Sequence, residues 1–215
     1  MFIFDDSIPI VALGEISTIV KGHNLVKNDM IDNGVGCIHY GEIYTYYDTY
    51  AAKTISYVSP EMAKKLVVVH NGDLIITVTG ENVRDICKCV AWLGEDDIVT
   101  GDHTAVIRHN QNPKYLSYWF QTIDFYKQKY KIAQGANVID VPISKIKEIK
   151  IPLPPLPIQE YIVDILDNFT MLISDINAEI NLRKQQYEYY MDKLLTFDNL
   201  QEPTIYCLKS QPPTT

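Results

Sequence analysis

Hydrophobic and polar positions change their period partway along the chain. Up to about residue 110, apolar residues come in short β-branched and aromatic runs broken by Gly, Asn and Asp, which predicts strands and turns. Asn71-Gly72-Asp73 predicts a hairpin-like turn between the two strands of KLVVVHNGDLIITVTG. The run CIHYGEIYTYYDTY, with Gly41 as its breaker, predicts strand, and further strands are expected at Cys87–Leu93 and Ala105–Arg108. After Asn112-Pro113, the segment YLSYWFQTIDFYKQKYK has the period of a helix.

A proline-rich segment, IPLPPLPIQE, separates this part of the chain from a long helical pattern. Its prolines, at 152, 154, 155 and 157, fix φ and remove backbone donors, so the segment is expected to be extended. From Ile158 to about Phe197 no Gly or Pro occurs, and a heptad pattern runs with one stutter at Ile176–Ile180 and with Arg183 in one stripe position. A helix of about 40 residues would be about 60 Å long and would need a partner helix to bury its stripe. The stripe residues are Ile162, Ile165, Phe169, Leu172, Ile176, Ile180, Tyr187, Tyr190 and Leu194.

These patterns predict an α+β protein with three parts. Residues 1–150 are expected to form a mixed-sheet domain, residues 151–200 a proline hinge and a long coiled-coil helix, and residues 201–215 a flexible tail.

Composition narrows the class of protein. Of the 215 residues, 47% are hydrophobic and 21% are charged, which excludes a disordered chain. No apolar run is long enough for a membrane span, and MFIFDDSIPIVAL lacks the basic start of a signal peptide. The four scattered cysteines favour a reduced, cytoplasmic protein. The formal net charge is −8, the wrong sign for a nucleic-acid binder, but residues 125–150 form a local basic stretch.

Three catalytic or metal-binding interpretations are weak. Asp140, Glu148 and Lys150 fit a loose nuclease pattern around Mg²⁺, although this spacing is common by chance. No GxGxxG loop occurs that would hold a methyl donor. Cys87-x-Cys89 lacks the spacing of a zinc site and is better explained as core cysteine. We therefore expect no catalytic residue, no metal and no cofactor.

Binding to double-stranded DNA has more candidates. Lysines neutralise phosphates, whereas Tyr, Gln and Asn reach base edges. An ordinary lysine-bearing helix explains the basic stretch equally well. The candidate DNA-binding residues are Tyr44, Tyr46, Tyr47, Thr79, Lys127, Lys129, Lys131, Gln134 and Asn137.

Several phrases together resemble a known family. IPLPPLPIQEYIVDILDNF followed by INLRKQQYEYYMDKLLTF is similar to the conserved segment of the DNA specificity subunit of type I restriction–modification systems. LGEI, IHYGEIYTYY, NGDLIITVTG and GDHTAVI resemble the target-recognition domain of the same family. The resemblance covers about residues 10 to 197.

The resemblance implies a non-catalytic subunit. Such a subunit holds two recognition domains joined by two long conserved helices, and it docks methyltransferase subunits and, through them, restriction subunits. This chain resembles a half-length form, with one of each, so it is expected to pair as a homodimer through its helix and to direct adenine methylation and cleavage by its partners. The alternative left open is an assembly or decoy protein that binds methyltransferase subunits without reading DNA.

Overall fold

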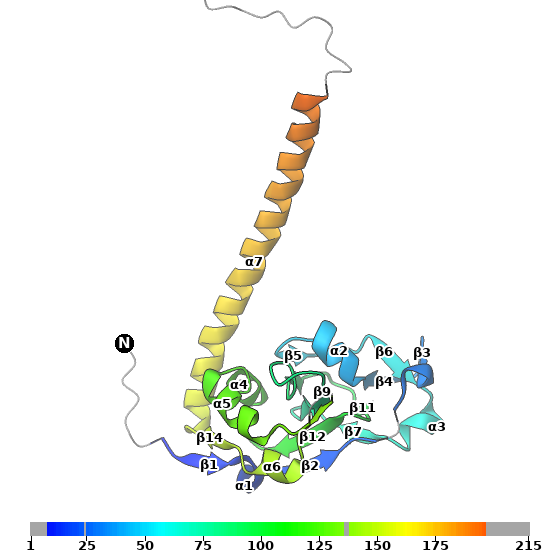
Figure 1. The fold of residues 1–215 in the computed structure, drawn as a ribbon, viewed down its shortest axis with the longest axis vertical. Coiled ribbons are helices and arrows are strands. Elements are labelled where there is room, and N and C mark those ends of the chain that lie inside the picture. Colours follow the sequence, from blue (N-terminus) through cyan, green and yellow to red (C-terminus); the bar gives the residue numbers. More distant parts are fainter. Residues whose placement is uncertain (1–7, 24, 136–137, 197–215) are drawn as a thin grey trace, which may run out of the picture. The chain divides into compact units, whose positions relative to one another are not determined.

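The computed structural model describes residues 8–23, 25–135 and 138–196. The chain divides into two units, residues 1–165 and residues 166–215. The first unit is a layered domain and the second contains the greater part of one long helix (Figure 1).

One mixed sheet occupies the middle of the domain. Its order is β2-β12-β8-β10-β5. Within this sheet β10 and β5 are parallel, and the other neighbouring strands are antiparallel. The strands are β2 (Ser17–Lys21), β5 (Tyr50–Ala51), β8 (Leu74–Thr77), β10 (Cys89–Trp92) and β12 (Thr104–His109).

A second mixed sheet packs against the first. Its order is β3-β6-β4-β11-β7, with β11 parallel to β4 and antiparallel to β7. The strands are β3 (Met30–Ile31), β4 (Val35–Ile38), β6 (Ser56–Val58), β7 (Val67–Val69) and β11 (Ile98–Thr100). Two strand pairs complete the described strands: β1 (Ile10–Ala12) with β14 (Lys150–Pro152), and β9 (Thr79–Gly80) with β13 (Ile139–Asp140).

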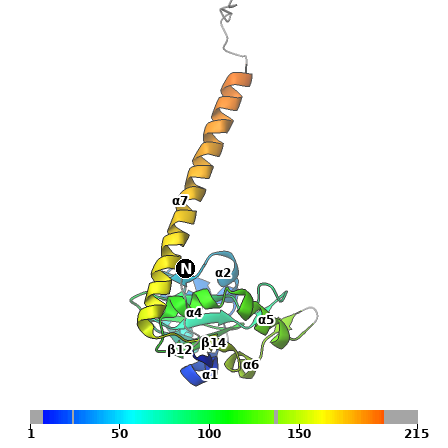
Figure 2. The ribbon, with the colours of Figure 1, turned by 90° about the vertical axis from the view of Figure 1, so that its left-hand side faces the viewer.

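Short helices cover the outer faces. Figure 1 places α4 and α3 at opposite ends of the domain, and α4 and α5 lie near each other in both ribbon views (Figures 1 and 2). The helices of the domain are α1 (Leu13–Ile16), α2 (Tyr40–Thr45), α3 (Pro60–Ala63), α4 (Pro113–Trp119), α5 (Ile123–Ile132) and α6 (Ile143–Lys147), with a 3₁₀ turn at Lys27–Asp29.

The central strands alternate between two cores, as the two-residue period of a strand requires. On β8, Leu74 and Ile76 face the core beneath α4, α5 and α6, whereas Ile75 faces the second sheet. A third, smaller core lies between the second sheet and α3, around Val58 and Leu66. The arrangement is helix, sheet, sheet, helix, and the predicted α+β class with a mixed sheet is confirmed.

The segment predicted to be strand through residue 50 is partly helix. Tyr40–Thr45 forms α2, because a capping box outweighs its β-rich composition: the His39 ring accepts a hydrogen bond from the Gly41 amide, and the Glu42 carboxylate accepts one from the His39 amide at 2.9 Å. Strand structure remains on either side, in β4 and β5. The strand prediction was therefore wrong for residues 40–45, where Gly41 lies inside a helix instead of marking a break between strands.

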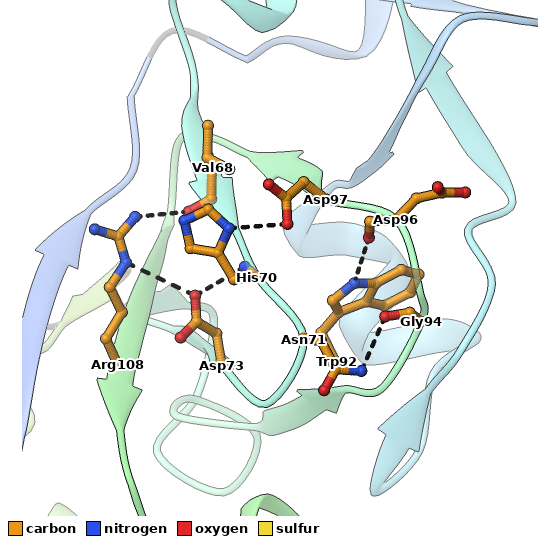
Figure 3. A network of polar contacts seen from close by, with 9 residues as sticks. All are labelled: Val68, His70, Asn71, Asp73, Trp92, Gly94, Asp96, Asp97 and Arg108. Carbon is orange, nitrogen blue, oxygen red and sulfur yellow. Dashed lines mark hydrogen bonds and ion pairs between the residues drawn. The ribbon is translucent and has the colours of Figure 1, made fainter.

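The predicted turn at Asn71-Gly72-Asp73 forms, with Gly72 at φ +88°, but it does not make a hairpin. β7 and β8 belong to different sheets. Figure 3 shows what holds this corner: Asp73 accepts a hydrogen bond from the His70 amide at 2.9 Å and faces Arg108 at 3.7 Å, and Arg108 donates to the Val68 carbonyl at 2.9 Å. These contacts turn the chain from one sheet into the other.

The single helix predicted after Pro113 is broken in two. α4 ends at Trp119 and α5 begins at Ile123, because Thr122 caps α5 through its side chain, which accepts from the Phe125 amide.

The long helix α7 spans Leu156–Leu195, close to the range from Ile158 to about Phe197 that the heptad pattern predicts. The second half of the proline-rich segment, residues 156–160, is therefore helix and not the extended chain expected, because Pro157 lies in the first turn, where proline is tolerated. Its first turns belong to the domain: Gln159 is fully buried, and its Nε2 donates to the Pro154 carbonyl at 2.8 Å while its Oε1 accepts from the Asn112 amide at 3.0 Å. Val163 is buried as well. The prolines before the helix therefore act together with a buried glutamine to fix where it begins.

Candidate nucleic-acid interface and helix face

A cleft of about 940 Å³ opens on the layered domain. It is lined by α2, by β9 and the loop that follows it, by the turn before β12, and by α5. Arg84 and Lys88 bring positive charge to it, and Asp48, Glu81 and Asp85 bring negative charge. Its walls thus present aromatic, hydroxyl and charged groups together, which can donate and accept hydrogen bonds.

Tyr44 joins α2 to the floor of this cleft. Its hydroxyl lies 2.9 Å from Thr77 Oγ1 and 3.0 Å from the Thr79 carbonyl oxygen. Burial raises the pKa of Tyr44 to about 12, so the phenol stays protonated and able to donate. Thr79 donates in turn to Asp140 at 3.1 Å.

Lys129 is built into the wall of the cleft. Only 6% of the residue is exposed, and its ammonium donates to the carbonyl oxygens of Arg84 and Ile86, both at 2.7 Å. Burial lowers the pKa of this lysine. The ammonium is already bonded to two carbonyl groups of the loop after β9. We therefore no longer expect Lys129 to contact phosphate, as the sequence had suggested.

Two residues of the cleft have left-handed backbone conformations. Cys87 (φ +61°) and His103 (φ +65°) are the non-glycine residues with positive φ in the part of the chain that the structure describes, and both line the cleft. Their backbones are held in place: the Cys87 amide donates to Thr77 and the His103 carbonyl accepts from Val78. Such strain costs free energy and is concentrated at functional sites. The His103 ring also meets Tyr40 edge-on, with centroids 4.7 Å apart.

The structure separates the other candidate DNA-binding residues. Tyr46 is exposed, while Tyr47 is buried and its hydroxyl accepts from the Ile55 amide at 3.0 Å. Lys127 is exposed beside Asp124 at 3.2 Å. Lys131 and Gln134 are exposed outside the cleft, and Asn137 lies outside the described residues.

Sequence reasoning missed Tyr40, His103 and the loop after β9. GDHTAVI is part of the family resemblance, but a left-handed histidine has no signature in composition. The cleft depends on a buried lysine, which the spacing of Lys127, Lys129 and Lys131 could not distinguish from its exposed neighbours.

The carboxylates of the nuclease pattern have separate structural partners. Asp140 accepts from Thr79, whereas Glu148 pairs with Lys145 at 2.9 Å on the surface. Among the described residues no group of three His, Cys, Asp or Glu side chains is arranged to hold a metal ion. Cys87 and Cys89 are buried free thiols, and burial raises the pKa of Cys87 to about 12.

The stripe of α7 changes character along its length. Ile162 and Ile165 are partly buried in the first unit. In the second unit the stripe is exposed at every predicted position, from Phe169, at 59%, to Leu194, at 70%. The exposed members between them are Leu172, Ile176, Ile180, Tyr187 and Tyr190. None of the helices described has the length and apolar character needed to cross a membrane.

Mixed sheets, a cleft and a long helix with an exposed apolar stripe make up this α+β protein. The family model "Type I restriction modification DNA specificity domain" matches residues 8–182. The chain therefore belongs to the type I restriction–modification DNA specificity family, as its sequence phrases suggest.

Individual relatives agree with this assignment. The chain is 27% identical over 203 residues to a putative type I restriction enzyme specificity subunit, S.HindORF215P, of Haemophilus influenzae, covering 90% of this chain and 49% of that protein. Its fold is similar to the S subunit of the type I system of M. genitalium, with a TM-score of 0.55 at 15% identity over 92% of this chain and 49% of that one. A chain from a structure on the assembly of the type I R-M system gives a TM-score of 0.65 at 17% identity, over 88% and 45%. The chain spans about half the length of these proteins.

Proposed function

We propose that this chain is a sequence-specific DNA-binding subunit that directs the chemistry of other chains. The observation that carries the proposal is the family match over residues 8–182 together with a cleft that contains both strained residues of the described domain. Its partners are methyltransferase subunits, which methylate adenine, and, through them, restriction subunits, which cleave. The chain itself supplies no catalytic group and works in the cytoplasm.

DNA recognition is assigned to the domain of residues 1–150. Tyr44 and Thr79 position the floor of the cleft, and Tyr40 and His103 present aromatic edges at its wall. Exposed Lys127 and Lys131 lie on α5, the helix that lines one side, and suit phosphates that pass beside the cleft. Phosphate contacts position the domain, and the cleft residues discriminate bases.

The helix of the segment 151–200 is assigned to assembly. An exposed stripe of large apolar residues on a 40-residue helix is unfavourable in water and is buried when a second helix packs on it. A second copy of this chain is the partner we propose, alongside contacts to methyltransferase subunits. Two copies related by a two-fold axis would read an interrupted palindrome.

Footprinting tests this function. The chain is purified with its methyltransferase partner and protected DNA is sequenced, for the wild type and for His103→Gly, which suits the left-handed backbone while it removes the ring. A specific footprint that His103→Gly relaxes is expected. Association with the methyltransferase without any sequence-selective protection would favour the alternative, an assembly protein that does not read DNA.

A further inference from the structure

Three lysine or arginine side chains line the cleft of the layered domain, and two of them are already bonded. The Lys88 ammonium donates to the Tyr47 carbonyl at 2.9 Å, and the Lys129 ammonium donates to the carbonyl oxygens of Arg84 and Ile86. The Arg84 guanidinium, by contrast, forms no hydrogen bond or ion pair with another described residue, and the residue is exposed. Of the three, Arg84 is therefore the one whose charged group is available to a ligand.

The loop that carries Arg84 is held at several points, although the arginine side chain is not. The Asn82 side chain accepts a hydrogen bond from the Asp85 amide at 2.9 Å and donates one to the Asp85 carboxylate at 2.7 Å. Ile86 is fully buried, and its amide donates to the Asn82 carbonyl at 3.2 Å. Together with the buried ammonium of Lys129, these contacts fix the backbone on both sides of Arg84. A fixed backbone reduces the conformational entropy that is lost when the arginine binds.

The charge of the cleft favours a base over a phosphate as the group that Arg84 binds. Asp48, Glu81 and Asp85 also line the cleft, so a phosphate there would meet three carboxylates. Asp48 and Glu81 are exposed and have no partner among the described residues. In the major groove, a guanine presents the acceptors O6 and N7 to the paired donors of an arginine, and the cytosine opposite presents an amino group that a carboxylate can accept. A G·C pair therefore suits both signs of charge in the cleft.

We propose that Arg84 is a specificity-determining residue that reads one guanine of the target through O6 and N7. This inference rests on the proposed DNA recognition and adds the residue and the base concerned. Lys127, which is exposed on α5 outside the cleft, is assigned to phosphate and serves as the comparison.

Competition binding with altered guanines measures this contact. The complex of the full chain with its methyltransferase partner is titrated with a duplex that carries the footprinted target. In further duplexes each guanine in turn is replaced by 7-deazaguanine, which lacks the N7 acceptor. One such replacement should weaken wild-type binding at least about fivefold and should have no further effect on Arg84→Ala. Arg84→Ala should itself bind the target roughly tenfold to a hundredfold more weakly, while urea unfolding of the domain stays unchanged.

Two further variants separate base recognition from phosphate binding. Arg84→Gln should prefer adenine to guanine at the same position, since a glutamine side chain pairs with adenine N6 and N7. Lys127→Ala, the matched control, should weaken binding to all duplexes alike. If Arg84→Ala also weakens all duplexes alike, lowers the salt dependence and keeps the 7-deazaguanine effect, then Arg84 contacts phosphate and the proposal is overturned.

Failure of this inference is distinguishable from failure of the proposed function. If the wild-type complex protects a specific site but no guanine is sensitive, or the sensitive guanine is equally sensitive in Arg84→Ala, this inference is overturned and the proposed DNA recognition stands. If the wild-type complex gives no sequence-selective protection, both are overturned.

Discussion

The two ends of α7 differ in how the same heptad pattern is satisfied. At its first turns, Gln159 and Val163 are buried in the layered domain and the glutamine makes three hydrogen bonds. Beyond Ile165 the stripe continues with side chains such as Phe169 and Ile176 more than half exposed. One helix thus serves two purposes: its start is part of a folded core, and its remainder is a surface that another helix can cover.

This comparison separates stability from assembly. Changes at the buried end should lower the free energy of unfolding of the domain, because they leave polar groups unpaired or cavities empty. Changes at the exposed end should leave that free energy nearly unaltered and act on association with a second chain.

The largest expected effect is the loss of self-association in Ile176→Asp. A carboxylate in the centre of the stripe must be desolvated in the paired state, so association should weaken by a factor of 100 or more. Analytical ultracentrifugation measures it, and urea unfolding of the domain should be unchanged. Asn177→Asp, which adds the same charge at the next residue but off the stripe, is the control. A dimer that survives Ile176→Asp would show that the stripe is not the contact surface.

At the buried end, Gln159→Leu should destabilise the domain by about 3 kcal/mol, because it leaves the Asn112 amide and the Pro154 carbonyl without their partner. Urea denaturation followed by tryptophan fluorescence measures the change. The matched control is Gln185→Leu on the exposed helix, where a change within about 0.5 kcal/mol is expected. Equal effects of the two substitutions would contradict the division of the helix.

Low pH should destabilise the layered domain through protonation of His109. Burial lowers the pKa of His109 to about 4, and its Nδ1 accepts from the Gln111 amide. The unfolded chain binds this proton more readily than the folded one. The contribution of neutral His109 to the free energy of unfolding is therefore fully present above about pH 6.5 and is lost as the pH falls towards 4. A loss on the order of 2 kcal/mol is expected, after allowance for partial exposure. His109→Asn should remove this part of the pH dependence, and an unchanged pH profile would assign it to other groups.

Lys129→Met should cost about 2 kcal/mol of domain stability, because two carbonyl oxygens lose their charged donor. Hydrogen exchange should show the loop after β9 opening more readily. Lys127→Met, on the exposed face of the same helix, should leave stability nearly unchanged and instead reduce the salt dependence of DNA binding. An equal reduction of the salt dependence in both variants, relative to the wild type, would mean that Lys129 also contacts phosphate.

Tyr44→Phe should have the smallest effect, about 1 kcal/mol, since it removes the hydroxyl that contacts Thr77 and Thr79 but keeps the ring. Thermal unfolding measures it, and Tyr46→Phe, at an exposed neighbour, is the control. A loss in Tyr46→Phe as large as that in Tyr44→Phe would mean that the phenol network does not support the cleft.

The sequence predicts long-period features better than local ones. The heptad of α7 and the start of this helix near its proline-rich segment are visible because proline geometry and the spacing of apolar residues act over many residues. α2 was mistaken for strand because a two-residue capping interaction between His39 and Glu42 decided its conformation.

The features that the sequence does not predict are decided by contacts between residues far apart along the chain. The turn at Gly72 is visible in the sequence, but the pairing of β7 and β8 with other strands is decided by distant partners such as Arg108. Burial of Lys129 likewise depends on two carbonyl groups more than forty residues away. The candidate cleft is assembled from segments whose meeting no local pattern encodes.

Mapping of methylated adenines in the source genome tests the central claim most directly. Strains are compared with the gene present, deleted, and restored either as wild type or as Tyr40→Ala/His103→Gly, which alters the cleft wall. One methylated motif, an interrupted palindrome, should disappear on deletion, return with the wild type, and return relaxed or altered at a defined base with the variant. A methylation pattern that is the same with and without the gene would contradict the account of this chain as the subunit that reads DNA.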